Sequence, residues 1–317
     1  MKKVLVVGGA GYVGGGVTNA LSRKEIPFVV YDNLLYEHQY LKPVDFIYGD
    51  VRDTEKLKKL LPEFSHVIWL AAIVGDAACQ VKPELTVSVN QEATRWLADN
   101  YDGRIIFLST CSVYGQHDGI ADENSLVNPL SLYAQTKLAT EKFLQNKNSL
   151  IFRLGTVFGV SDTHSRLRMD LVVNYMTGTA LTEGKLTVFG GEQWRPLIHV
   201  KDIAQIVVDN LDKDINGIYN VATTNIQIKD LAKIISGLTS CEIEWTGKQF
   251  EDMRNYRAST EKAEKAGIMN LVSVHDIEIG AKEIASLIKS GRMKFGQSDI
   301  YSNERHITNL FKNGEFK

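Results

Sequence analysis

The hydrophobic residues in the first half of the chain fall in short continuous runs. Most of these runs are rich in Val, Ile and Leu. The runs cover residues 3–7, 28–32, 45–50, 66–72, 104–110 and 150–159. Strands that are apolar at successive positions are usually buried on both faces of a sheet. The pattern therefore predicts interior strands rather than strands with one face in water.

Segments with helical spacing of apolar residues separate these runs. They cover residues 13–24, 54–64, 83–101 and 130–143. Regular alternation of strands and helices predicts a parallel, doubly wound α/β sheet with right-handed crossovers. We find no internal repeat and no low-complexity segment in the sequence.

After about residue 160 this alternation is lost. The spacing predicts short strands around a turn within residues 186–200, and it predicts several more helices. The helices are expected at residues 165–178, 201–211, 228–238 and 274–290. The polar segment from residue 293 to the end receives no assignment. This half is expected to be a smaller region lying over the C-terminal edge of the sheet.

The composition argues against several classes of function. Hydrophobic residues make up 44% and charged residues 23% of the 317, and the formal net charge of −2 gives no reason to expect nucleic acid or an anionic membrane as partner. No stretch approaches the ~18 apolar residues of a membrane span, and the apolar start runs into glycines, unlike a signal peptide, so we expect a cytoplasmic protein. Cys79, Cys111 and Cys241 form no CxxC pair, so neither a disulfide framework nor a metal site is expected.

A glycine-rich segment follows the first predicted strand and opens the first predicted helix. "GGAGYVGG", residues 8–15, contains the spacing G-x-G-x-x-G. Glycine is needed because the turn is tight and the backbone must approach a pyrophosphate closely. The pyrophosphate then lies at the helix N-terminus, where unpaired N–H groups favour an anion. The residues expected to bind a dinucleotide here are Gly8, Gly11, Tyr12, Val13 and Gly14.

Acidic residues after the second and third strands refine this prediction. Asp32 ends the second strand eighteen residues beyond Gly14, close to the ~20 expected for an acid that binds the ribose hydroxyls. Its charge would repel a 2′-phosphate and no Arg directly follows it, so NAD is favoured over NADP. Asn33 is a neighbouring cofactor candidate. Asp50 and Val51 could flank the adenine, although Asp50 could equally cap a helix.

Tyr133 and Lys137 lie four residues apart in the helix predicted over residues 130–143, so the phenol and the ammonium share one face. A phenol has a pKa near ~10, but a lysine cation and a positive nicotinamide ring both favour the phenolate. Such a tyrosine could remove a proton from a sugar hydroxyl while hydride leaves the same carbon. Lys137 would also hold the nicotinamide ribose. Alone, the pair could be an ordinary surface pair; beside the glycine loop we interpret it as catalytic.

Polar residues also follow the fifth strand, in "LSTCSVYG", residues 108–115. Ligands of parallel sheets bind at this edge. Thr110 could share the substrate proton with Tyr133. Ser109 and Ser112 could contact a ligand or serve structure, and Cys111 could be a buried apolar residue. At the end of the fourth strand, three residues could line the cofactor path or belong to the core: Leu70, Ala71 and Ala72.

These motifs together resemble the extended short-chain dehydrogenase/reductases, in the NAD-dependent nucleotide-sugar epimerase/dehydratase family. Over about residues 1–205 the matching segments are "GGAGYVGG", "VYDNL", "GDVRD", "LAA", "VSVNQEAT", "STCSVYG", "YAQTK", "RLGTVFG" and "RPLIHVKDIA", and "MRNYRAST" matches further on. The resemblance implies an NAD-binding Rossmann domain at residues 1–160. It implies that residues 161–317 mostly bind substrate, with some segments returning to the Rossmann core. Members of the family oxidise a sugar hydroxyl, usually at C4, to a ketone.

The resemblance also assigns roles to single residues. The catalytic positions of the family fall on Thr110, Tyr133 and Lys137. Asn90 matches a residue at the cofactor, and Asn174 matches one that contacts the nucleotide or diphosphate of the substrate. Arg195 and Arg254 match arginines that hold the diphosphate, since a guanidinium offers two parallel donors to phosphate oxygens. Arg195 could otherwise be a packing residue. The implied substrate is a nucleotide-diphosphate sugar.

The residues after Thr110 distinguish the reactions of the family. Its 4,6-dehydratases carry an Asp-Glu pair where this chain has Cys111 and Ser112, which supply no carboxylic acid/base couple. A C4 epimerase needs only the Thr, Tyr and Lys, NAD, and room for the keto sugar to turn over. We therefore expect an epimerase of surface-glycan, deoxysugar or heptose synthesis that also uses Cys111 and Ser112 to contact substrate. The alternatives, in order, are a C4 dehydrogenase or ketoreductase, a 4,6-dehydratase, and a non-catalytic NAD(P)-binding sensor.

Three charged residues in loops remain. Asp76 follows the fourth strand and could contact substrate or pack its loop. Arg166 and Arg168 could reach phosphate or sugar, but we expect them on a solvated basic face. Finally, the resemblance implies a homodimer built from the helices at residues 84–100 and 131–147.

Overall fold

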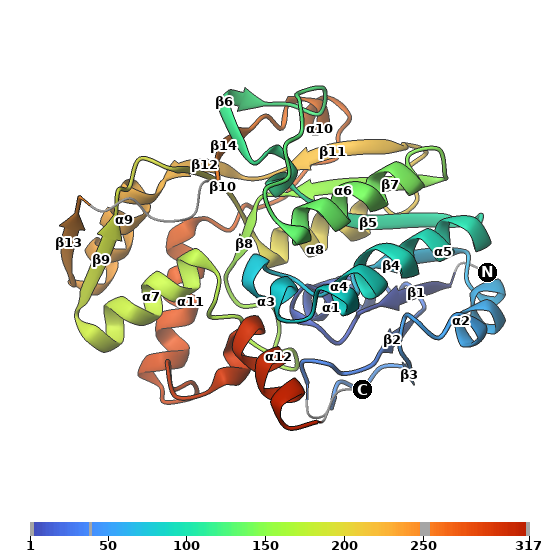
Figure 1. The fold of residues 1–317 in the computed structure, drawn as a ribbon, viewed down its shortest axis with the longest axis horizontal. Helices are drawn as coiled ribbons and strands as arrows, with labels where there is room; N and C mark the ends of the chain where they lie inside the picture. The colour runs from blue at the N-terminus through green and yellow to red at the C-terminus, as the bar shows by residue number, and fades with distance from the viewer. Residues whose placement is uncertain (1–2, 38–39, 248–253, 315–317) are drawn as a thin grey trace.

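Seven strands form a parallel sheet at the centre of the computed structural model, which describes residues 3–37, 40–247 and 254–314 (Figure 1). All neighbouring strands of this sheet pair in parallel, in the order β11-β7-β5-β4-β1-β2-β3. The strands are β1 (Val4–Val7), β2 (Phe28–Asp32), β3 (Phe46–Tyr48), β4 (His66–Trp69), β5 (Arg104–Thr110), β7 (Ser149–Leu154) and β11 (Gly217–Val221). The direction of winding reverses between β1 and β4, and such reversals are where α/β sheets bind ligands. The predicted doubly wound sheet is confirmed.

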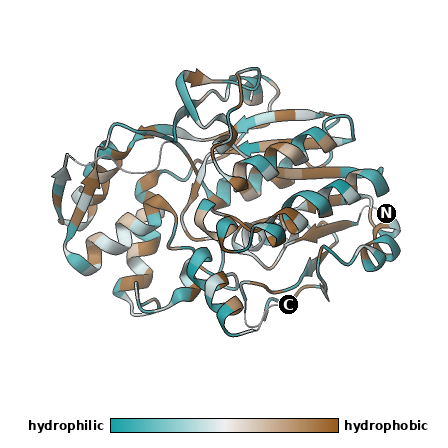
Figure 2. Cartoon of the chain, in the orientation of Figure 1, coloured by the Kyte–Doolittle hydropathy of each residue, from teal (hydrophilic) through white to brown (hydrophobic). Residues whose placement is uncertain are grey.

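Helices cover both faces of the sheet because both sets of alternating strand side chains are apolar. Val4 and Val6 of β1 belong to the core under α1 and α8, whereas Leu5 and Val7 belong to the core under α2, α5 and α6. The bounds are α1 (Tyr12–Arg23), α2 (Thr54–Leu60), α5 (Ala93–Asn100), α6 (Leu132–Leu144) and α8 (Val200–Asp209). Figure 2 shows the hydrophobic residues concentrated in the central strands. This explains why the strands read as continuous apolar runs.

Short helices connect β4 to α5. They are α3 (Asp76–Val81), α4 (Pro83–Val87) and a π-helical turn η2 (Ser88–Glu92), which runs directly into α5. The helix predicted over residues 83–101 is therefore present, with a π-bulge in its middle. Such bulges are rare and are frequent at functional sites. Two 3₁₀ turns follow α2 and β5: η1 (Leu61–Glu63) and η3 (Cys111–Tyr114).

The second half of the chain forms a smaller lobe beside the sheet, on the left of Figure 1. Its helices are α7 (Val172–Glu183), α9 (Ile228–Thr239) and α11 (Ile277–Lys289), whereas α10 (Glu261–Lys265) packs against β11 of the central sheet. Its strands form the pair β9 (Lys185–Phe189) with β13 (Glu242–Thr246) and the trio β8 (Thr156–Phe158), β10 (Trp194–His199) and β12 (Thr224–Gln227). A further pair, β6 (Gln116–Ala121) with β14 (Asn255–Ala258), lies at the top of Figure 1. The segments α8 and β11 return to the central sheet.

Two expectations for this half are wrong or incomplete. The helix predicted at residues 165–178 begins only at Val172, and residues 165–171 form a loop. The polar C-terminal segment, which received no assignment, contains the 3₁₀ turn η4 (Asp299–Tyr301) and the helix α12 (Asn303–Lys312). Within the described residues, no helix combines the length and apolar character needed to cross a membrane.

Candidate active site

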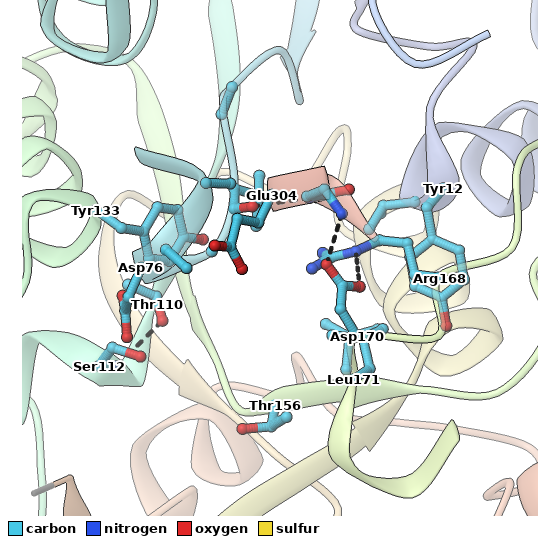
Figure 3. A pocket seen from close by; sticks show the side chains of 18 of the residues that line it. Tyr12, Asp76, Thr110, Ser112, Tyr133, Thr156, Arg168, Asp170, Leu171 and Glu304 are labelled. Atoms are coloured by element: carbon cyan, nitrogen blue, oxygen red, sulfur yellow. Dashed lines mark hydrogen bonds and ion pairs between the residues drawn. The ribbon is translucent and has the colours of Figure 1, made fainter. Parts of the chain in front are cut away.

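A large cavity opens at the carboxyl ends of the central strands, between the sheet and the second lobe. Its volume is about 1350 Å³, above the ~300–1,000 Å³ typical of a single small-molecule pocket. Its walls include the ends of β1, β2, β4 and β5, the start of α6, and residues of α7, β9 and α12. Figure 3 shows the reactive side chains around its central part. The space is sufficient for two ligands side by side.

The glycine loop forms one wall and has the shape that a pyrophosphate requires. Gly8 has φ +80°, and a Cβ there would stand 2.4 Å from the amide nitrogen of Ala71. A Cβ at Gly14 would stand 2.4 Å from the carbonyl oxygen of Gly9. At Gly11, by contrast, a Cβ would meet nothing nearer than 3.5 Å, so the lack of a side chain leaves open space at the start of α1. This loop fits a dinucleotide, because an anion can reach the helix N-terminus.

Asp32 lies at the end of β2 on the cavity wall, as expected for a ribose ligand. Its carboxylate accepts hydrogen bonds from the amides of Ala10 (3.0 Å) and Leu34 (2.8 Å). Burial raises its pKa, and these backbone donors act in the opposite direction. Asn33 also lines the cavity, and its amide nitrogen donates to Asp50 over 3.1 Å.

The adenine side differs from the prediction at one residue. Val51 lines the cavity, but Asp50 does not. The Asp50 carboxylate instead accepts hydrogen bonds from the Arg52 side chain at 2.8 and 2.9 Å. Asp50 is therefore a loop-stabilising residue and not part of the cavity wall. The strand-end residues of β4 follow the prediction, since three of them line the cavity: Leu70, Ala71 and Ala72.

Tyr133 and Lys137 lie on the face of α6 that is turned to the cavity. Ser131 caps the helix by accepting the amide of Ala134 (3.3 Å), so Tyr133 sits in the first turn. The Lys137 side chain is buried, and its Nζ lies 6.0 Å from the centroid of the Tyr133 ring. Nζ also donates to the carbonyl of Leu108 over 2.8 Å. The pair shares one face of the helix, as its spacing predicts.

The charge of Arg168 acts to lower the pKa of the Tyr133 phenol, but burial outweighs it. Burial raises the pKa of the Tyr133 phenol, and the charge of Asp76 acts in the same direction. Burial also lowers the pKa of Lys137, to about 8. A phenolate at this position therefore depends on further positive charge, such as a nicotinamide cation would supply.

Some residues of the strand-end motif after β5 line the cavity, and others are directed into the core. Thr110 lines the cavity, and its hydroxyl accepts the amide of Ser112 over 3.1 Å. Ser112 also lines the cavity and lies 3.2 Å from the hydroxyl of Tyr256. Ser109 lines it too, but its hydroxyl donates to buried Glu141. Cys111 does not line the cavity, because the turn η3 directs its sulfur to the carbonyl of Arg153 at 3.2 Å in the core.

Two asparagines implied as ligand contacts also lie off the cavity. The side chain of Asn90, in the π-helical turn, accepts the Ile73 amide (2.8 Å) and donates to the Ile73 carbonyl (2.9 Å). Asn174 accepts the amide of Gly159 (2.9 Å) and donates to the carbonyl of Arg168 (2.8 Å). Their amides satisfy buried backbone groups. Both residues therefore position loops of the cavity wall without reaching its interior.

The residues expected to meet the substrate diphosphate converge in the same cavity. Arg195 and Arg254 both line it, and Arg195 donates to the backbone carbonyl of Arg254. The guanidinium of Arg254 forms an ion pair with Asp76 at 3.0 Å. The other Asp76 carboxylate oxygen, Oδ1, is buried and has no hydrogen-bond partner among the described residues. Figure 3 shows Asp76 on the same side as Tyr133 and Thr110.

Arg166 and Arg168 are buried, so the prediction of a solvated basic face is wrong. Arg168 lines the cavity opposite Tyr133 (Figure 3) and donates through Nε to Asp170 over 3.0 Å. Although burial opposes it, Arg168 holds the pKa of Asp170 below its ordinary value. The sequence contains the pattern Arg-x-Arg-x-Asp, but nothing local shows that it becomes part of a cavity wall. Sequence reasoning also missed Tyr36, whose hydroxyl is buried and unpaired within the described residues.

Comparison with known proteins agrees with this geometry. The model of the NAD dependent epimerase/dehydratase family matches residues 4–222. The chain is 28% identical over 264 residues to a UDP-glucose 4-epimerase of Rhizobium meliloti, covering 73% of this chain and 80% of that one. It is 24% identical over 269 residues to an ADP-L-glycero-D-manno-heptose-6-epimerase of Alkalilimnicola ehrlichii, covering 77% and 81%.

A solved structure extends the comparison to the cofactor. The NAD complex of the UDP-glucose 4-epimerase of Thermus thermophilus superposes with a TM-score of 0.76 and 25% identity, covering 89% of this chain and 99% of that one. The family match spans both the glycine loop and the Tyr133/Lys137 pair. The chain therefore belongs to the NAD-dependent epimerase/dehydratase family of extended short-chain dehydrogenases/reductases, and its cofactor is NAD.

Proposed function

We propose that this enzyme is a nucleotide-sugar C4 epimerase. One observation supports it above the others: Thr110, Tyr133 and Lys137 line one cavity together with Arg195 and Arg254. The first three can activate a sugar hydroxyl, and the two arginines can hold the diphosphate that carries the sugar. Relatives of this chain include nucleotide-sugar epimerases, which agrees with this substrate class.

The proposed mechanism uses each side chain for one task. NAD bound along the glycine loop would supply a reversible hydride acceptor for the sugar carbon. Tyr133 takes the proton of the C4 hydroxyl, and Thr110 hydrogen-bonds the same oxygen. The Lys137 ammonium and a bound nicotinamide cation would together favour the phenolate. Arg195 and Arg254 would retain the diphosphate as the keto sugar turns over. Once the keto sugar has presented its other face, hydride would return to that face of C4 and Tyr133 would return the proton to the C4 oxygen, which leaves C4 inverted.

The residues beside Thr110 do not support elimination of water. Cys111 is directed into the core, and burial raises the pKa of its thiol. Ser112 has no acid strength at neutral pH. Loss of water across C5 and C6, as in a 4,6-dehydratase, needs an acid for the departing hydroxyl and a base for the C5 proton. A C4 dehydrogenase or ketoreductase remains the second candidate, because the same three catalytic residues serve it.

In this proposal the two halves of the chain bind different ligands. Residues 1–160 bind NAD and residues 161–317 mostly bind the sugar nucleotide, while α8 and β11 complete the Rossmann sheet. We further propose a homodimer that pairs the helices of residues 84–100 and 131–147 with those of a second copy. Size-exclusion chromatography coupled to light scattering measures that assembly directly.

Substitution of Tyr133 by Phe tests the catalytic proposal. We expect turnover to fall by about 10²–10⁴-fold, the usual contribution of a general acid/base, while NAD remains bound. Tyr48→Phe is a matched control, because Tyr48 is exposed and off the cavity. Turnover is followed with UDP-, GDP-, CDP- and dTDP-sugars by mass spectrometry and NMR. Unchanged mass with inverted C4 supports an epimerase, loss of two hydrogens favours the dehydrogenase, and near-normal rates in Tyr133→Phe contradict the assignment.

A further inference from the structure

The C-terminal segment forms one wall of the cavity, which no sequence motif predicts. Residues 299–312 comprise η4 and α12, which packs against α3 at the bottom of Figure 1. Ser302, Asn303 and Glu304 line the cavity, and Figure 3 shows Glu304 between the side of Tyr133 and the side of Arg168. This segment lies outside the Rossmann sheet, yet it contributes to the space where the dinucleotide binds.

The segment bridges the loops on either side of the glycine loop. His306 Nε2 lies 2.8 Å from the carbonyl of Leu35, just after β2, and Asn303 donates to the carbonyl of Val74, after β4, over 2.7 Å. Strand β1 lies between β2 and β4 in the sheet. The glycine loop, at the carboxyl end of β1, therefore lies between the two anchoring points of α12.

A third set of contacts closes the wall on the side of the second lobe. Asn303 donates its backbone amide to Asp170 over 2.9 Å, and its side-chain oxygen accepts from Arg166. Arg166 also donates to the carbonyl of Ile300. Asn303 is only 2% exposed. One buried asparagine thus joins α12, the β4 loop and the segment that presents Arg168 to the cavity.

We propose that residues 299–312 are a clasp that retains the dinucleotide, so that the cofactor stays bound through complete turnover. Asp32 and Tyr133, which would hold the two ends of a dinucleotide, both line the cavity, and α12 is anchored beside it at Leu35 and Val74. Its release then requires the buried bonds of Asn303 to break. Retention matters because an epimerase must return the hydride to the same sugar. This role of the clasp rests on the proposed function, whereas its effect on cofactor exchange can be measured without a sugar substrate.

Cofactor exchange tests the clasp. Purified holoenzyme is mixed with excess radiolabelled NAD, and incorporation of label is followed by rapid gel filtration. We expect Asn303→Ala to accelerate exchange by about 10-fold or more, since a buried hydrogen-bonding side chain is lost. His306→Ala, which removes the anchor at Leu35, should accelerate it by a smaller factor. Arg305→Ala is the matched control on the same helix, because the Arg305 side chain is 62% exposed, and exchange should stay within about 2-fold of wild type.

The outcomes separate the clasp from the enzyme assignment. Faster exchange in Asn303→Ala and His306→Ala, with an unchanged control, supports the clasp whatever sugar is used. Wild-type exchange rates in folded Asn303→Ala or in His306→Ala overturn it, as does wild-type exchange that is faster than turnover. If Asn303→Ala does not fold, His306→Ala decides alone. A sugar screen without C4 inversion would overturn the proposed reaction and leave the exchange result standing.

Discussion

Replacement of Lys137 by Met should stabilise the protein near neutral pH and abolish most of its activity. The Lys137 side chain is 4% exposed, its ammonium lies 4.5 Å from the centroid of the Phe107 ring, and its one hydrogen bond within the described residues goes to the Leu108 carbonyl. Met has a similar length and no charge. The substitution therefore removes a buried cation without opening a large cavity.

The expected size follows from the pKa of Lys137. Burial lowers it from 10.5 to about 8, and since one pKa unit is worth about 1.4 kcal/mol, the folded protein carries a cost of about 3 kcal/mol for the charged lysine. The variant also loses the hydrogen bond to Leu108 and the contact with Phe107, which lowers its stability by about 1–2 kcal/mol. We expect Lys137→Met to be more stable than wild type by about 1–2 kcal/mol near pH 7.

The sign should reverse at high pH. Between the folded pKa and the unfolded pKa, the unfolded chain binds the extra proton, so wild-type stability rises as pH increases. At pH 10 only about 0.8 kcal/mol of the cost of the charged lysine remains, given the two pKa values. The variant cannot make this gain, and at pH 10 it should be less stable than wild type by about 0.5 kcal/mol, since part of the lost contacts is still offset by the remaining cost. Groups that titrate in both proteins cancel in the difference.

Urea unfolding of both proteins near pH 7 and near pH 10, without added NAD, measures this difference. Equal m-values would show that the comparison concerns stability alone. A variant that is less stable at both pH values by the same amount would refute the reasoning, because Lys137 would then carry no burial cost. Retained turnover in the variant would separately contradict its catalytic role.

Two further predictions concern other charged groups. Asp32→Ala should weaken NAD binding by about 10-fold or more and reduce discrimination against NADP, measured as the ratio of the two dissociation constants. Asp50→Ala is the control, because Asp50 lies off the cavity. An unchanged ratio in Asp32→Ala would count against the ribose role. Glu141→Gln should lower the free energy of unfolding by about 3–5 kcal/mol, because it leaves buried Arg153 without its carboxylate partner at 2.7 Å. The exposed Glu278→Gln should cost about 0.5 kcal/mol or less in the same denaturation assay, and similar losses for both would contradict the burial argument.

The central sheet could be predicted from the sequence because its signals are local. Continuous apolar runs fix which segments are interior strands, and the glycine loop marks where β1 passes into α1. The strand order and the partners of the short strands could not be read in this way. For example, β6 pairs with β14 and β9 with β13, across more than fifty intervening residues in each case. Such pairings depend on packing of the whole lobe, and alternation along one strand does not encode its partner.

The candidate site shows the same limit at single residues. Thr110, Tyr133 and Asp32 were predicted from strand ends and helix spacing, and all three line the cavity. Cys111 and Asn174 were placed there by resemblance, but each points to buried backbone instead. A motif identifies the segment that approaches a ligand. The rotation of the following turn or helix decides which of its side chains reaches the cavity, and that rotation is set by tertiary packing.

The loop at residues 165–171 failed as a helix prediction for a related reason. The spacing of Leu, Met and Arg in this loop matches a helix. Some of its backbone and side-chain donors, however, bond to carbonyls of the C-terminal segment around residue 300. The Met169 amide donates to the Tyr301 carbonyl over 2.9 Å, and Arg166 is bound by the same segment. Buried backbone groups that find partners outside the segment do not need a helix to satisfy them. A local pattern cannot reveal such partners.

Helix α6 shows how the fold keeps one buried charge available. Lys137 and Glu141 are four residues apart, the spacing at which opposite charges usually pair on a helix. Here Glu141 accepts hydrogen bonds from Arg153 at 2.7 Å and from Ser109 instead. Lys137 is left with a neutral carbonyl as its hydrogen-bond partner, although its ammonium is buried beside Tyr133. A carboxylate paired directly with Lys137 would neutralise the field that a phenolate needs. In the proposed mechanism this arrangement leaves the Lys137 ammonium without a carboxylate in direct contact, although the charge of Glu141 still acts to raise the pKa of Lys137.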